Sequence, residues 1–157
     1  MTIRTHLFKE LNGFDEDFFA HMEEIDLCWK LHRRNLKVMY CGKSSVYHLG
    51  AGTLGYGNPK KTYLNFRNGL SLIYKHLNPI ELIFKLPARI LMDWLAALRF
   101  VLGSDSANAR AILKAHRDFF ENIKRDKRKR EEIRKSNPGY SQTGIVKGSV
   151  VFDFFIL

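Results

Sequence analysis

The spacing of apolar residues predicts that amphipathic helices make up most of the chain. Residues 23–34 fit a helix with an acidic first turn and a basic last turn, which complements the helix dipole at both ends. Residues 59–77 follow an Asn58-Pro59 start signal and carry apolar side chains at spacings of three and four, which predicts a second helix. Its apolar positions are Tyr63, Phe66, Leu70, Ile73 and Leu77.

A third helix is expected over 88–102, after Pro87. Its charged residues, Arg89, Asp93 and Arg99, occupy a sector of roughly 120° on a helical wheel. The rest of its surface is apolar, which is wider than a helix on a globular protein needs. Ser104-Asp105-Ser106 is expected to end this helix and cap another, which runs into the basic residues 124–130.

Shorter elements are expected between these helices. Residues 5–11 fit a short helix or a strand and lead into the turn signal Asn12-Gly13. Residues 37–41 and 45–48 are expected to form two short strands, followed by a glycine-rich mobile loop over 49–58. The segment from 136 onward is expected to be loose, with a final apolar stretch at 150–157.

Composition places the chain among ordinary globular proteins. Its 157 residues are 45% hydrophobic and 27% charged, which excludes a disordered polymer. Cys28 and Cys41 are too few for a disulfide scaffold, so a reducing compartment is expected. No run of about 18 uncharged apolar residues occurs, so no membrane-spanning helix is expected, and the first residues do not resemble a secretory signal.

The charge of the chain is high and uneven. The net charge is +10, which favours an anionic partner such as phosphate, nucleic acid or a membrane surface. Residues 1–29 carry a net charge of −5, whereas 124–135 carry +5. The acidic end suits a metal or a proton transfer, and the basic end suits a polyanion. Aromatic residues do not interleave the basic run, so base stacking and a nucleic-acid partner are not expected.

Three groups of residues are candidates for chemistry. Glu23, Glu24 and Asp26 share one helical turn, where like-charge repulsion is expected to raise their pKa values while the helix N-terminus opposes that shift. A carboxylate held in this way can act as a general base, although an acidic first turn is also common in helices without function. His48 ends a predicted strand and fits either a metal ligand or a structural histidine. A zinc site would have to combine Cys28, His32, Cys41 and His48, and it lacks a paired C-x2-C.

Read together, the motifs resemble the second half of family 2 glycosyltransferases, and most closely the rhamnosyltransferase-like members. The matching segments run in order over about 3–77. They are Asn12-Gly13-Phe14-Asp15-Glu16-Asp17-Phe18-Phe19, Glu23-Glu24-Ile25-Asp26-Leu27-Cys28-Trp29, Val46-Tyr47-His48 and Gly50-Ala51-Gly52-Thr53. The resemblance implies an α/β, helix-dominated chain: a partial GT-A (Rossmann-like) domain without the N-terminal nucleotide-binding half, followed by amphipathic helices. The expected units are 1–78, 79–135 and 136–157.

The resemblance also implies an activity and roles for residues. The expected reaction is inverting transfer from a nucleotide-diphosphate sugar to a glycan or polyprenyl-linked acceptor, with Mg²⁺ or Mn²⁺ on the diphosphate, in bacterial cell-surface polysaccharide synthesis. Glu24 matches the base and Glu23 and Asp26 are its acidic neighbours, whereas His48 matches a metal ligand. The implied acceptor-binding residues are Asp15, Glu16 and Trp29.

The chain also departs from the family pattern. Glu24 stands where the family usually has aspartate, and Asn12 replaces a glycine. Asp15-Glu16-Asp17 is a formal D-x-D, but it lacks the preceding hydrophobic strand that would aim it at a metal. The donor-binding strands and their D-x-D would precede residue 12, so we expect an N-terminal partner half. The expected location is the inner face of the cell membrane. The alternatives are a non-catalytic basic module that binds membranes or polyanions, and an incomplete relic without independent function.

Overall fold

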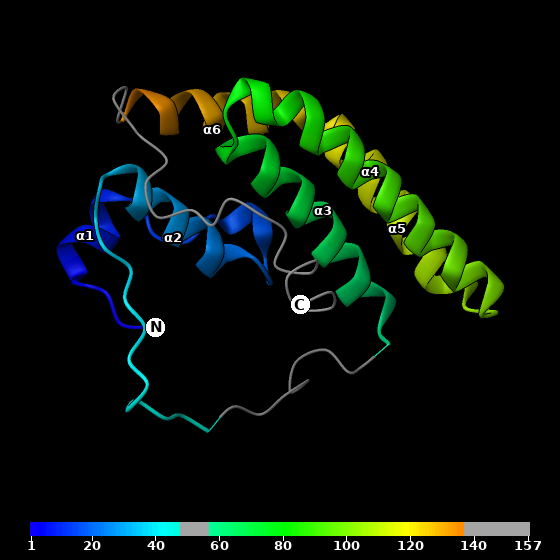
Figure 1. The fold of residues 1–157 in the computed structure, drawn as a ribbon, viewed down its shortest axis with the longest axis horizontal. Helices are drawn as coiled ribbons and strands as arrows, with labels where there is room; N and C mark the ends of the chain where they lie inside the picture. The colour runs from blue at the N-terminus through cyan, green and yellow to red at the C-terminus, as the bar shows by residue number, and fades with distance from the viewer. Residues whose placement is uncertain (48–56, 137–157) are drawn as a thin grey trace, which may run out of the picture.

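The computed structural model describes residues 1–47 and 57–136, and within them helices are the regular structure (Figure 1). The elements are α1 Thr5–Glu10, a short 3-10 helix η1 Glu16–Phe18, α2 Glu23–Arg33, α3 Pro59–His76, α4 Pro79–Leu102, α5 Ser106–Glu121 and α6 Ile123–Lys135. The helix-dominated character of the chain is therefore confirmed. The GT-A assignment stays a prediction. His48, residues 49–56 of the expected loop and the segment 137–157 lie outside the described residues.

Three of the helices begin directly after a residue whose side chain caps them. Asn58, Asn78 and Asp105 each accept a hydrogen bond on the side chain from a backbone N–H at the start of the following helix. Pro59 and Pro79 occupy first positions, where the missing N–H costs nothing. These local signals fix the starts of α3, α4 and α5.

Two of the expected helix boundaries are wrong. The third helix does not start after Pro87 but at Pro79, and it passes through Pro87. Pro87 is exposed, so water can reach the backbone carbonyl that its missing N–H leaves unbonded. The last helix does not run unbroken into the basic segment. It breaks at Asn122, whose side-chain amide donates to the carbonyl of Asp118 at 2.7 Å.

The two expected strands are not found in the part of 37–48 that the structure describes. Residues 37–47 form a coil with a turn at Gly42-Lys43, and their apolar side chains, among them Met39 and Val46, are exposed. A single short strand has no neighbour to accept its backbone hydrogen bonds, and the described residues supply none. The β-branched and aromatic residues of this segment are therefore insufficient to form a sheet.

The helix α3 is the centre of the fold. It packs against α4, α5 and α6 on one side, and the loop before α2 is bound to it on the other (Figure 1). Residue 78 is the expected boundary between the first two units, and α3 before it packs against α4, α5 and α6 after it. A small apolar core joins α1 to α2 through Leu11, Leu27 and Leu31. Buried apolar residues of α5 face α3, and they include Ile112, Ala115 and Phe119.

Candidate functional site

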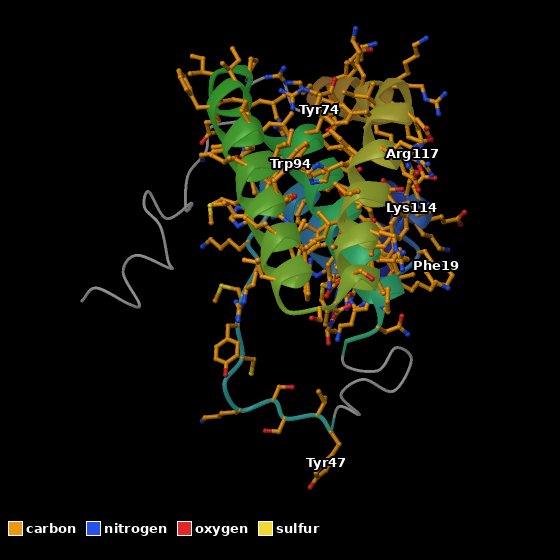
Figure 2. The ribbon with its side chains drawn as sticks, turned by 90° about the vertical axis from the view of Figure 1, so that its right-hand side faces the viewer. Phe19, Tyr47, Tyr74, Trp94, Lys114 and Arg117 are labelled. Atoms are coloured by element: carbon orange, nitrogen blue, oxygen red, sulfur yellow. The ribbon has the colours of Figure 1, made fainter. Side chains whose placement is uncertain are left out.

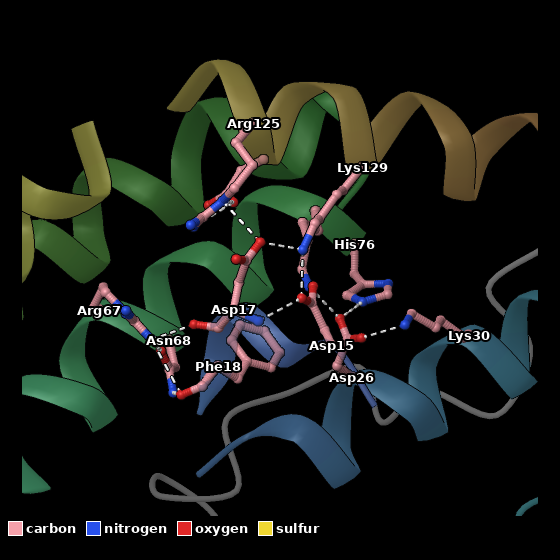
Figure 3. Close-up of polar contacts among 12 residues, drawn as sticks. Asp15, Asp17, Phe18, Asp26, Lys30, Arg67, Asn68, His76, Arg125 and Lys129 are labelled. Atoms are coloured by element: carbon pink, nitrogen blue, oxygen red, sulfur yellow. Dashed lines mark hydrogen bonds and ion pairs between the residues drawn. The ribbon is translucent and has the colours of Figure 1, made fainter. Parts of the chain in front are cut away.

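The turn between Phe18 and Met22 is clamped by the buried side chain of Asn68 on α3. The Asn68 Nδ2 amide lies 3.0, 2.8 and 2.8 Å from the carbonyl oxygens of Phe18, Ala20 and His21 (Figure 3). Its Oδ1 accepts from the Arg67 guanidinium, at 2.9 Å from Nε and 2.6 Å from Nη2. Arg67 also donates to the carbonyl of Asp17 at 2.6 Å. Two neighbouring residues of α3 therefore hold the backbone of one turn.

This turn has an unusual backbone conformation. Phe19, His21 and Met22 all have positive φ angles, 61°, 68° and 75°. A side chain at such a φ costs about 1–3 kcal/mol, and such costs persist where the surrounding structure fixes the chain. The Asn68 clamp provides that fixation. Glu23 and Glu24 follow this turn directly as the first residues of α2.

A buried ionic network lies beneath the turn, centred on Asp26 of α2. The Asp26 carboxylate is fully buried and meets Lys75 Nζ at 2.7 Å, His76 Nε2 at 2.8 Å and Lys30 Nζ at 3.0 Å. Lys75 also meets Asp15 at 2.8 Å. One ammonium of α3 thus joins the loop carrying Asp15 to the helix carrying Asp26.

The network sets the protonation of its members. Burial alone would raise the pKa of Asp26, but the hydrogen bond from His76 and the charge of Lys75 hold it well below its ordinary value. Burial also opposes ionisation of Asp15, yet Lys75 and Lys129 lower its pKa to about 2. Burial lowers the pKa of His76 to about 4, so the imidazole is neutral at pH 7. Its Nε2–H donates to Asp26, because a carboxylate can only accept.

Basic residues of α6 neutralise the acidic loop. Lys129 Nζ lies 2.5 Å from Asp15 and also pairs with Asp17 (Figure 3). Arg125 Nε lies 3.1 Å from Asp17. Part of the basic end of the chain is therefore bound to the acidic end, and these residues are not free for an external polyanion.

The three carboxylates predicted as one catalytic cluster occupy different environments. Asp26 is buried in the network, Glu23 is half-buried and Glu24 is exposed. Successive residues of a helix point about 100° apart, so α2 directs position 26 toward α3 and position 24 toward solvent. One Glu23 carboxylate oxygen is buried and has no hydrogen-bond partner within residues 1–47 and 57–136. Glu24 is consequently the member that an external hydroxyl can reach.

The predicted acceptor residues are separated as well. Asp15 and Glu16 line a cavity of about 440 Å³ between the loop over 10–17, the end of α2 and the end of α6. Phe14 adds an exposed aromatic ring to this cavity. Trp29 and Glu24 do not line it. Trp29 packs against His76 instead, with ring centroids 5.2 Å apart.

Within the described part of the chain, no group of three or more His, Cys, Asp or Glu side chains is placed to hold a metal. Asp15, Asp17 and Asp26 already neutralise lysine and arginine side chains, so a cation would have to displace those partners. These residues therefore do not fit the implied Mg²⁺ or Mn²⁺. His48, the expected ligand, lies outside the described residues.

Reasoning from the sequence missed the residues that build the site, Asn68, Lys75 and His76. They lie about fifty residues along the chain from their partners, beyond the reach of helical spacing. The sequence signal that could have indicated them is that Asn68, Lys75 and His76 are polar residues of the amphipathic helix expected over 59–77.

Comparisons with known proteins give no match. Neither a protein family, nor a curated protein, nor a solved structure matches this chain.

Proposed function

We propose that this chain is the acceptor-side part of an inverting glycosyltransferase in which Glu24 is the general base. The observation that carries the proposal is the strained turn over 18–22, which Asn68 clamps and which only Glu23 separates from Glu24. Backbone strain of this kind gathers at active sites, where it holds a side chain in a working position. The motif resemblance independently assigns the base to Glu24.

In the proposed reaction, Glu24 accepts the proton of an acceptor hydroxyl while the hydroxyl oxygen attacks the anomeric carbon. A new carbon–oxygen bond forms, the bond to the diphosphate oxygen breaks, and the nucleoside diphosphate leaves with the bonding electrons. A sugar hydroxyl is too weak an acid to ionise at neutral pH, so a base within hydrogen-bond reach is needed. Glu24 is exposed to such a hydroxyl, whereas Asp26 is buried and held as a weak base.

Groups for the nucleotide-sugar donor and its divalent cation are proposed to come from an N-terminal partner half. The described residues offer no cluster for the cation. We place Asp15 and Glu16 at a sugar-sized cavity in which Glu16 is exposed and Asp15 is held by lysines. Glu16 is therefore the better candidate to meet an acceptor glycan, at a sugar unit other than the one whose hydroxyl reaches Glu24, since Glu24 does not line this cavity.

We place this activity at the inner face of the cell membrane, through peripheral attachment. None of the helices among the described residues is both long and apolar enough to cross a bilayer. A polyprenyl-linked acceptor would be presented at that surface. The alternative, a non-catalytic basic membrane module, is favoured by the many apolar side chains exposed on α4.

Donor turnover separates the two functions. The test is to co-express the chain with a candidate nucleotide-sugar-binding half and to follow release of nucleoside diphosphate from a panel of nucleotide sugars with Mg²⁺ or Mn²⁺. Release that depends on both polypeptides supports the enzyme. Vesicle binding without release from any donor supports the non-catalytic module.

A further inference from the structure

The helix α4 exposes an apolar stripe along its whole length. Its members are between 52% and 79% exposed and fall within a sector of roughly 120° on the helical wheel. The helix has 24 residues, and the stripe spans about 33 Å along it at 1.5 Å per residue. We call these residues the α4 stripe: Ile80, Ile83, Phe84, Leu91, Trp94, Leu95, Leu98, Val101 and Leu102.

The opposite side of α4 is already used for packing. Asp93 and Ala97 are buried there, and Asp93 Oδ2 lies 3.1 Å from His116 Nε2 of α5. Arg89 pairs with Asp93 at 2.6 Å. The α4 stripe is therefore surplus to the contacts that hold the helix in place, and a contiguous apolar surface of this size marks an interaction site.

The ionised groups beside the stripe are mostly cationic. Together α4 and α5 carry six bases and four acids, so the excess is two positive charges. Three of the exposed bases are paired with acids of their own helix, Lys85 with Glu81, Lys114 with Asp118 and Arg117 with Glu121. Arg99 and Arg110 are also exposed. Figure 2 shows α4 and α5 side by side facing the viewer, with Trp94 on one and Arg117 on the other. An apolar stripe with basic flanks is complementary to an anionic lipid surface, where acyl chains meet negatively charged headgroups.

We propose that α4 lies flat in the interface of an anionic bilayer, with the α4 stripe among the lipids and the basic residues of α4 and α5 at the headgroups. This deepens the peripheral attachment proposed above and rests on it. Trp94 suits that depth, because its indole N–H donates to His116 Nδ1 at 3.3 Å while its ring is largely exposed. A second copy is a poorer partner for this surface, since a two-fold contact would bring two cationic flanks together.

The first test uses the two tryptophans of the chain. In the full-length Trp29→Phe variant, Trp94 is the sole reporter. Vesicles of equal parts phosphatidylcholine and phosphatidylglycerol should shift its emission to the blue and protect it from iodide, whereas pure phosphatidylcholine should do so far less. Protection of Trp94 without vesicles, together with a dimer in light scattering, would mean that a second copy covers the stripe and would overturn the proposal.

The second test measures partition into the same vesicles by flotation. The double variant Leu91→Asp and Leu98→Asp should bind at least about a hundredfold more weakly. It loses two leucines that would be buried in the bilayer, and it adds two negative charges. The control is Met39→Asp with Val46→Asp, which changes the net charge equally at exposed apolar residues outside α4. The partition of this control should fall only by about fivefold for each added negative charge, which is the effect of surface electrostatics alone.

A third variant tests the basic flank. Arg110→Gln with Arg117→Gln should lower partition about 25-fold at low salt and reduce its salt dependence. Far-UV circular dichroism confirms that each variant keeps its helices.

The outcomes separate the two claims. Binding is measured without donor or acceptor, so it does not depend on sugar transfer. If the wild-type chain does not bind anionic vesicles, peripheral attachment itself is refuted. Wild-type chain that binds while the stripe variant binds equally well would refute only the assignment to α4.

Discussion

Replacing Lys75 by methionine should strongly destabilise the fold. Lys75 is 1% exposed, and its ammonium lies 2.8 Å from Asp15 and 2.7 Å from Asp26. It also lies 4.1 Å from the centre of the Phe18 ring. Methionine has a similar length and volume, so the substitution removes the charge and leaves the packing nearly unchanged.

The expected loss in free energy of unfolding is about 3 kcal/mol. Removing one partner of a buried ion pair costs about 3–5 kcal/mol, because the other charge stays buried. The lower end applies here, since Asp26 keeps Lys30 and His76 while Asp15 keeps Lys129. With a denaturant slope of about 1–3 kcal/mol per molar, the urea midpoint should fall by at least about 1 M.

The loss should also depend on pH. The folded pKa of Asp15 is lowered to about 2, below the ordinary 3.8, so its ion pairs stabilise the fold above pH 4. That contribution, about 2 kcal/mol, disappears as the pH falls toward 2. Removing Lys75 raises the native pKa of both carboxyls, so the difference between variant and wild type should shrink at pH 3.

Urea unfolding followed by circular dichroism at pH 7 and pH 3 measures this effect. Lys85→Met is the matched control, because Lys85 forms an exposed pair with Glu81 at 2.7 Å and should cost less than about 1 kcal/mol. A loss below 1 kcal/mol for Lys75→Met at pH 7, or the same loss at both pH values, would refute the buried network.

Asn68→Asp should cost about 2–4 kcal/mol in urea unfolding, because an acceptor would face three carbonyl oxygens, and a cost under 1 kcal/mol would contradict the clamp. The low pKa of His76 should make wild type lose stability as the pH falls from about 6.5 to 4, whereas His76→Gln should not show that slope. The chain alone should bind nucleotide sugars poorly in calorimetric titration with Mg²⁺ or Mn²⁺, and micromolar binding would place the donor site in this chain.

Features set by neighbouring residues could be predicted from the sequence. The bounds of α2 and α3 and the caps at Asn58 and Asp105 depend on spacings of a few residues, and they are confirmed to within one residue, whereas the cap at Asn78 was not predicted. Pro87 misled the prediction because a proline on an exposed helix face can be tolerated. The prediction of two strands was wrong because a strand needs a neighbouring strand to accept its backbone hydrogen bonds, and local sequence does not reveal whether one is present.

The site was predictable only in part, for the same reason. The cluster of Glu23, Glu24 and Asp26 was found from its spacing, but its division into buried and exposed members depends on α3. The opposite charges of the two ends predict two separate tasks, yet Lys129 and Arg125 bind the acidic loop more than a hundred residues away. Contacts of that kind are set by tertiary packing and leave no local pattern.

Sugar transfer by the assembled enzyme with Glu24→Gln tests directly whether Glu24 is the general base. Glutamine keeps the shape of the side chain and removes its basicity. We expect kcat to fall about a hundredfold or more while donor binding is nearly unchanged. Glu23→Gln should lower kcat by a smaller factor than Glu24→Gln. Near-wild-type turnover of Glu24→Gln, with Glu23→Gln or Asp26→Asn inactive, would contradict the assignment of the base.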